Sequence, residues 1–110
     1  MIPKIDTAVL ADTIRKECDR IYKTFVYKNK SYGVGNDAFH NFRNTAIRVH
    51  GSDTAENMFK TLLTYKDKHD VAIANKGLND QEFAERCRDI ALYSLIAIGM
   101  FEAKQNADRM

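Results

Sequence analysis

Four groups of residues in this chain combine side chains that could bind a ligand. The first is the stretch Lys28-Asn29-Lys30-Ser31-Tyr32-Gly33-Val34-Gly35, which holds lysines, a hydroxyl group, an aromatic ring and glycine amides. Such groups can bind phosphate and stack on a base. The stretch lacks the GxxxxGK[ST] spacing of a P-loop, so it names no particular ligand. A glycine-rich connection with solvated lysines explains it at least as well.

The second group is the segment from His40 to Asn44, which would place those two residues on one face of a helix. The amide of Asn41 can hydrogen-bond the edge of a base, and the guanidinium of Arg43 can hold a phosphate through two bonds. In the alternative interpretation these polar residues are simply exposed, and only the phenylalanines beside them matter.

The third group is the segment from Lys66 to Asp70. Helical spacing pairs Lys66 with Asp70 and puts His69 on an apolar stripe. A neutral imidazole there could bind a base, a phosphate or a metal, but a histidine on an apolar face is more often a hydrogen-bonded core residue.

The fourth group follows one face of the last predicted helix, with Glu82, Glu85 or Arg86, Asp89 and Tyr93 at spacings of three and four. Asp89 stands where a strongly apolar stretch begins, and an unpaired carboxylate is costly in such a place. It therefore needs a partner, and the candidates are Lys66, His69, Arg86, a backbone donor or a bound cation. An ion pair with a purely structural role and a ligand site are about equally good explanations.

Helical periodicity runs through most of the chain, and it is interrupted by Pro3 and five glycines. The first apolar stripe predicts a helix over residues 6–28, before the glycines of the first group. Asn36 suits the N-cap of a second helix that ends at Gly51. Its stripe is Phe39, Phe42, Ala46 and Val49.

Two capping-box patterns predict the starts of the remaining helices. Asp53 with Glu56 opens the third helix, which Gly77 ends. Its predicted inner face is Met58, Leu62, Tyr65, His69 and Ile73. Asn79 with Glu82 opens the fourth helix, which we expect to run to about Lys104.

The fourth helix is apolar on nearly every side from Ile90 to Phe101. A helix of that kind is buried on every side, and we expect three neighbours in so small a domain to leave part of it uncovered. The sequence therefore predicts an all-α fold, a compact four-helix bundle that self-associates through its apolar fourth helix. We expect one domain over residues 1–110, with a frayed polar tail at residues 105–110.

Composition excludes several classes of protein. The chain has 110 residues, of which 45% are hydrophobic, so one domain with a core is expected. A net charge of +2 gives no argument for a nucleic-acid partner. No apolar run reaches the roughly 18–20 residues of a membrane span, and no leader segment is evident. Cys18 and Cys87 match no metal-site spacing, so we expect reduced thiols and a cytoplasmic protein without a membrane partner.

Taken in order, these segments resemble phage- and prophage-type relatives of the all-α MazG-like and dimeric dUTPase-like nucleotide pyrophosphatases, among them nucleotide-modification-associated proteins. The resemblance spans residues 28 to about 100. It rests on four short segments, which are K-x-K-x-Y-G at Lys28, Lys30, Tyr32 and Gly33, N-F-R from Asn41 to Arg43, K-H-D from Lys68 to Asp70, and R-D-I-A-L-Y from Arg88 to Tyr93.

The resemblance implies a helical bundle, usually dimeric, whose ExxE and ExxD motifs hold a Mg²⁺ that bridges a triphosphate and activates water. Asp89 matches the last position of ExxD, but Arg86 stands where its glutamate would be. Glu56 opens an ExxE whose fourth position is Phe59. Ligand binding is therefore implied more strongly than hydrolysis. The candidate catalytic residues are Asp89 and Glu85, and the candidate Mg²⁺ ligands are Asp70, Glu85 and Asp89.

We therefore expect a small phage-type protein that binds a nucleotide, or a cyclic or otherwise derived nucleotide, in the host cytoplasm. It would serve nucleotide metabolism or sequester a host nucleotide signal as a counter-defence protein. The expected ligand contacts are Lys28, Lys30, Tyr32, Asn41, Arg43, Lys66, His69, Asp89 and Tyr93. Two alternatives stay open: a Mg²⁺-dependent nucleoside triphosphate pyrophosphohydrolase, and a helical interaction module that uses the fourth helix as a protein interface.

Overall fold

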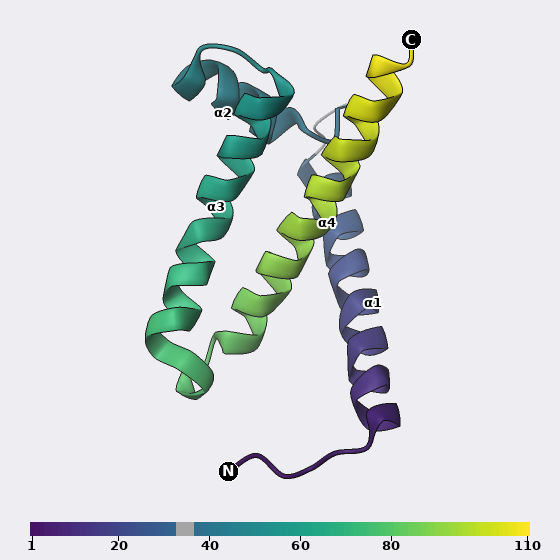
Figure 1. The fold of residues 1–110 in the computed structure, drawn as a ribbon, viewed down its shortest axis with the longest axis vertical. Coiled ribbons are helices and arrows are strands. Elements are labelled where there is room, and N and C mark those ends of the chain that lie inside the picture. The colour runs from purple at the N-terminus through teal and green to yellow at the C-terminus, as the bar shows by residue number, and fades with distance from the viewer. Residues whose placement is uncertain (33–36) are drawn as a thin grey trace. The chain divides into compact units, whose positions relative to one another are not determined.

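The computed structural model describes residues 1–32 and 37–110, with side chains described up to residue 29 in the first range. It confirms the all-α class, with four α-helices, one short 3₁₀ helix and no strand in those ranges (Figure 1). The chain divides into two compact units, Met1–Ala38 and Phe39–Met110. Among the helices in the described ranges, none has the length and apolar character needed to cross a bilayer.

The first unit contains helix α1, Thr7–Tyr32. The carboxylate of Asp6 accepts the backbone N–H of Ala8 at 2.9 Å and so satisfies one donor of the first turn. The prediction that this helix ends near Lys28 was wrong. Asn29 continues the helix and donates its side-chain amide to the Phe25 carbonyl at 2.9 Å, and the first glycine comes only after Tyr32.

The second unit begins with helix α2, His40–His50. Gly51 ends it in the left-handed conformation, with φ +87°, as predicted. The proposed N-cap Asn36 lies outside the described residues, and Phe39 occupies the N-cap position without a side-chain cap. Phe42 and Ala46 are buried as predicted, but Val49 is 62% exposed. The core cluster takes in the middle of α2 and leaves its last turn in solvent.

Helix α3 spans Ala55–Lys76, and its N-cap is Thr54. The Thr54 hydroxyl accepts the backbone N–H of Asn57 at 3.2 Å. The predicted cap, Asp53, was wrong by one residue because its carboxylate instead accepts a hydrogen bond from Arg43 of α2, with Nη1 and Oδ2 2.9 Å apart. Gly77 ends the helix with φ +64°, where a side chain would strain the backbone.

Helix α4 spans Phe83–Asp108 and follows a 3₁₀ turn, η1, at Gly77–Asn79. Its start was predicted too early. The N-cap residue is Glu82 rather than Asn79, and it makes no side-chain cap hydrogen bond. Just before it, the Asp80 carboxylate accepts the Glu82 backbone N–H at 3.1 Å and the Arg86 Nε at 2.9 Å. The predicted end near Lys104 was too early, since the helix continues to Asp108 and an ion pair of 2.8 Å between Lys104 and Asp108 lies in its last turn. Fraying of residues 105–110 stays a prediction.

Helices α3 and α4 are antiparallel neighbours in the second unit, and α2 packs on α3 (Figure 1). The buried cluster is Phe42 and Ala46 of α2 with Met58 and Leu62 of α3. The residues packed around it are half-buried, and several come from α4; they are Phe39, Tyr65, Tyr93, Ile96, Ala97 and Met100. A Cβ atom at Gly99 would lie 3.7 Å from the Phe39 ring, so the entry to α2 also approaches α4.

The apolar stretch of α4 is not buried on every side, which corrects the prediction for Ile90 to Phe101. None of the α4 residues, all of which are described, is fully buried. Leu95 and Ile98 are each 52% exposed and Phe101 is 63% exposed. In residues 39–110, α4 is packed against α3 and against side chains at the start of α2, and these cover only one side of it.

Replacing Leu62 by alanine should lower the free energy of unfolding by about 2–5 kcal/mol, because Leu62 is 1% exposed and its loss leaves a cavity. Leu78→Ala is the matched control, since Leu78 is 70% exposed and should change the value by no more than about 0.5 kcal/mol. Urea unfolding followed by circular dichroism measures both. Equal losses in the two variants would contradict the position of the core.

The hydrogen bonds of the Asp80 carboxylate at the entry to α4 predict a pH dependence of stability. Hydrogen bonds from the Glu82 backbone and then from Arg86 lower the pKa of Asp80 below its usual 3.8. A carboxylate with a lowered pKa stabilises the fold above its unfolded pKa, and that stability is lost as the pH falls through the folded pKa. Asp80→Asn should therefore be less stable than wild type at pH 7, and the difference should narrow as the pH falls below 3.8. Urea unfolding across this range tests it, with the exposed Asp67→Asn as control.

Candidate functional site

Helices α3 and α4 bring together two residues that are 20 apart in the sequence, His69 and Asp89. The nearest ring nitrogen, Nε2 of His69, lies 3.6 Å from Oδ2 of Asp89, which is longer than a good hydrogen bond. The His69 side chain is 12% exposed, whereas that of Asp89 is 40% exposed. Asp89 thus has one of the partners proposed for it, and part of the carboxylate remains open to solvent.

The second ring nitrogen of His69 is unusual for a nearly buried polar atom. Its Nδ1 is buried and has no hydrogen-bond partner among the described residues. Buried polar atoms are nearly always hydrogen-bonded, and leaving one unpaired costs free energy. The interpretation of His69 as a satisfied core histidine is therefore wrong for this atom. The imidazole is held by packing, and its polar atoms are poorly satisfied by the protein itself.

Aromatic rings form the packing around this histidine. Tyr93 follows Asp89 by one turn of α4, and its ring lies 6.2 Å from the His69 ring, tilted by 33°. Phe42 of the core contacts Tyr93 edge-on at 6.4 Å and Tyr65 at 5.8 Å. Burial, followed by the negative charge of Asp89, raises the pKa of the Tyr93 hydroxyl above its usual value. The environment of Tyr93 is thus apolar on one side and negatively charged on the other.

Lys66 and Asp70 pair with one another on the same helix as His69. The Lys66 ammonium lies 2.8 Å from the Asp70 carboxylate, and both side chains are partly exposed, at 24% and 39%. Pairs of this kind, four residues apart on a helix surface, are weak. An incoming anion could therefore compete with Asp70 for Lys66.

The three candidate metal ligands do not form one cluster. Asp70 is paired with Lys66, Asp89 lies beside His69, and Glu85 is exposed. Within the part of the chain that the structure describes, no group of three or more His, Cys, Asp or Glu side chains is arranged to hold a metal ion. Mg²⁺ binding and hydrolysis stay predictions that the geometry of these residues does not favour.

Two of the predicted ligand contacts lie on α2. Asn41 is exposed. Arg43 is paired with Asp53 and lines a hollow of about 230 Å³ near the start of α3, together with Met58. Met58 precedes His69 by 11 residues, which is ~16 Å along a helix. The structure therefore does not bring Arg43 next to the His69 and Asp89 pair.

The remaining predicted contacts belong to the N-terminal unit or fall outside the described side chains. Lys28 is an exposed residue of α1. The side chains of Lys30 and Tyr32 lie outside the described residues. These three contacts stay predictions.

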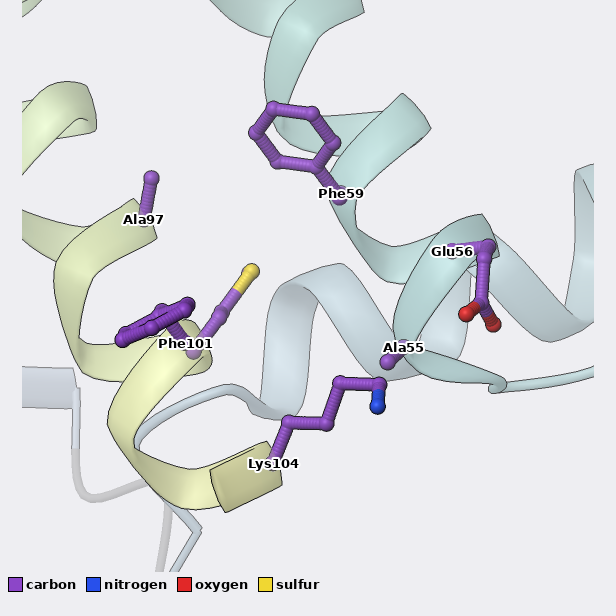
Figure 2. A pocket seen from close by; sticks show the side chains of 7 residues that line it. Ala55, Glu56, Phe59, Ala97, Phe101 and Lys104 are labelled. Carbon is purple, nitrogen blue, oxygen red and sulfur yellow. The ribbon is translucent and has the colours of Figure 1, made fainter.

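Sequence reasoning missed a second, larger hollow of about 390 Å³ between α3 and α4 (Figure 2). Phe59 and Phe101 lie on its two walls, and Met100 also lines it. The other lining residues are Ala55, Glu56, Ala97 and Lys104. Their spacings of three and four along each helix are visible in the sequence, but periodicity indicates an apolar face without saying whether a neighbour covers it.

Comparison with protein-family models, with curated proteins and with solved structures finds no match to this chain. The site must therefore be interpreted from its own geometry.

Replacing Asp89 by asparagine should lower the pKa of Tyr93 toward its usual value, because the phenolate no longer faces a negative charge. The shift should be partial, since burial, the larger cause, remains. Absorbance titration of tyrosinate measures the pKa of Tyr93. Because the chain has five tyrosines, the same titration of Tyr93→Phe, with and without Asp89→Asn, identifies the part of the signal that comes from Tyr93. Asp67→Asn should leave the Tyr93 titration unchanged. An unchanged midpoint in Asp89→Asn would contradict the described proximity of the two groups.

Proposed function

We propose that this protein binds a nucleotide, or a ligand derived from a nucleotide, at the site formed by His69, Asp89 and Tyr93. The observation that supports this best is the meeting of two distant segments. K-H-D on α3 and R-D-I-A-L-Y on α4 are two of the four segments that resemble the all-α nucleotide pyrophosphatases, and His69 and Asp89 from them approach to 3.6 Å.

The chemistry of the three side chains suits a nucleoside. The ring of Tyr93 offers an aromatic surface for a base, because stacking depends on a π-face that every base has. The Asp89 carboxylate is partly exposed and accepts hydrogen bonds, so it can bind a ribose hydroxyl or the amino group of a base. The poorly satisfied His69 imidazole would gain a partner from such a ligand, directly or through water.

The residues that would bind the phosphate groups are less clearly defined than those that would bind the nucleoside. Lys66 is on the same helix as His69 and is bound to Asp70 by a pair that a phosphate could displace. Lys28, Lys30, Tyr32 and Asn41 stay predicted contacts on the basis of the sequence segments in which they lie. Arg43 is not proposed as a contact of this site, because it is paired with Asp53 near the start of α3, away from the His69 and Asp89 pair. In a phage-type protein in the host cytoplasm, binding would serve nucleotide metabolism or the sequestration of a nucleotide signal.

We also propose that the protein works as a homo-oligomer through α4. Leu95, Ile98 and Phe101 support this, since a helix that exposes more than half of three large apolar side chains gains from burying them. The same observation favours a second candidate function, an interaction module without a small ligand. Whether the protein binds a nucleotide distinguishes the nucleotide-binding function from the interaction module.

Native mass spectrometry of protein purified from cells, followed by calorimetric titration with a nucleotide panel, tests ligand binding. One nucleotide class should bind, and His69→Gln and Asp89→Asn should each weaken it at least about tenfold, which corresponds to about 1.4 kcal/mol. Asp67→Asn, an exposed carboxylate on the same helix as His69, serves as control and should bind as wild type does.

Binding that is unchanged in both variants would place the ligand elsewhere, and no binding by any nucleotide would favour the interaction module. The same panel with Mg²⁺ tests hydrolysis. Release of pyrophosphate that Asp89→Asn abolishes would favour the pyrophosphohydrolase instead of a binding protein.

A further inference from the structure

The hollow between α3 and α4 lies at the end of the helix pair that is distant from η1. It is lined by the first turns of α3 and the last turns of α4 (Figure 2). Its main apolar side chains are not sequestered from water, since Phe59 is 44% exposed and Phe101 is 63% exposed. Two phenylalanine rings on the walls of an open hollow are a surface that a partner could bury.

The apolar surface continues along both helices beyond the hollow. Leu63 follows Phe59 by one turn and is 45% exposed. Ile98 precedes Phe101 by one turn and is 52% exposed. Residues three or four apart share a helix face, so the surface extends along both helices in the direction of η1. A partner with two helices fits such a surface better than a small molecule confined to the hollow.

Two charges of opposite sign line the hollow. Glu56 belongs to α3 and Lys104 to α4, on opposite walls (Figure 2). Lys104 also pairs with Asp108 at 2.8 Å, but these two side chains are 50% and 63% exposed, and a pair that exposed is weak and easily exchanged. The surface therefore presents one acid and one base, each on its own helix.

We infer that a second copy of this chain docks on the hollow in a two-fold symmetric dimer, an inference that rests on the self-association proposed above. A two-fold interface joins the same surface in both copies, so it requires a surface that complements itself. Because α3 and α4 are antiparallel, the Glu56 and Lys104 ends of the two helices lie at the same end of the pair. A two-fold axis parallel to the two helices then places α3 of one copy over α4 of the other and keeps the Glu56 and Lys104 ends of both copies together.

This arrangement uses both charges and both rings. Glu56 of each copy meets the other copy's Lys104, so the contact forms twice, and the Phe59 and Phe101 rings are enclosed between the pairs of helices. The product is a bundle of four helices, two from each copy. An unrelated partner with a surface of one charge would match only one of the two walls, whereas a second copy matches both.

Charge reversal tests the dimer in a way that contacts within one chain cannot imitate. Glu56→Lys alone and Lys104→Glu alone each place like charges together twice, so each should raise the dimer dissociation constant at least tenfold. When the two variants are mixed, one copy has two lysines and the other has two glutamates at these positions. Every contact between copies is then attractive, and the mixed dimer should form as wild type does. Within each variant chain, the charges at positions 56 and 104 still have the same sign, so contacts within one chain cannot explain the restored dimer.

Native mass spectrometry of the mixture, with one variant isotope-labelled, counts the mixed dimer directly. Lys68→Glu, a charge reversal on α3 outside the hollow, is the control and should dimerise as wild type does. Phe101→Gln is a second variant, which should weaken the dimer without unfolding the chain because Phe101 is largely exposed. Circular dichroism verifies that every variant is folded.

The outcomes are distinguishable. A wild type that forms oligomers while the single variants still dimerise, or while the mixture stays monomeric, would overturn docking at this hollow and leave self-association standing. A monomeric wild type at every accessible concentration would overturn both. Nucleotide titration of the same samples reports separately on the ligand site, whose residues are not altered.

Discussion

The packing of α3 against α4 is the constraint on which the rest of the second unit depends. Leu62 at 1% exposure and Ala46 at 0% mark the centre of that packing, where α2 and side chains of α4 meet α3. The register of two antiparallel helices determines which residues face one another along their whole length. In this register, His69 faces Asp89 in the half of the helix pair nearer to η1. Phe59 and Phe101 line the hollow at the other end.

The polar site is positioned by apolar contacts more than by hydrogen bonds. Phe42 touches the rings of both Tyr65 and Tyr93, and Tyr93 in turn lies against His69. The Asp89 carboxylate approaches Nε2 of the imidazole only to 3.6 Å, and Nδ1 has no partner among the described residues. A core that leaves a buried polar atom unsatisfied departs from the usual consistency of folded proteins, and such departures concentrate at functional sites.

Features that depend on a local sequence pattern were predicted correctly. Features that depend on which of two residues makes a tertiary contact, or on which helix face a neighbour covers, were not. Gly51 and the burial of Phe42 and Leu62 follow from turn chemistry and periodicity, and the structure confirms them. The caps were misplaced because Asp53 and Thr54 can both cap α3, and only the contact of Asp53 with Arg43 decides between them. The partner of Asp89 was limited to a short set that included His69. The hollow was missed because an apolar pattern does not reveal which face stays uncovered.

Helix α4 changes its role along its length. Asp89 and Tyr93 lie in its first half, where they face a histidine and an aromatic cluster, whereas Phe101 and Lys104 line the open hollow in its second half. Asp89 and Phe101 are 12 residues apart, which is ~18 Å along the helix. Sites farther apart than about 7–10 Å without shared partners act nearly additively. Ligand binding and assembly can therefore be altered one at a time, and each proposal stands on its own part of the same helix.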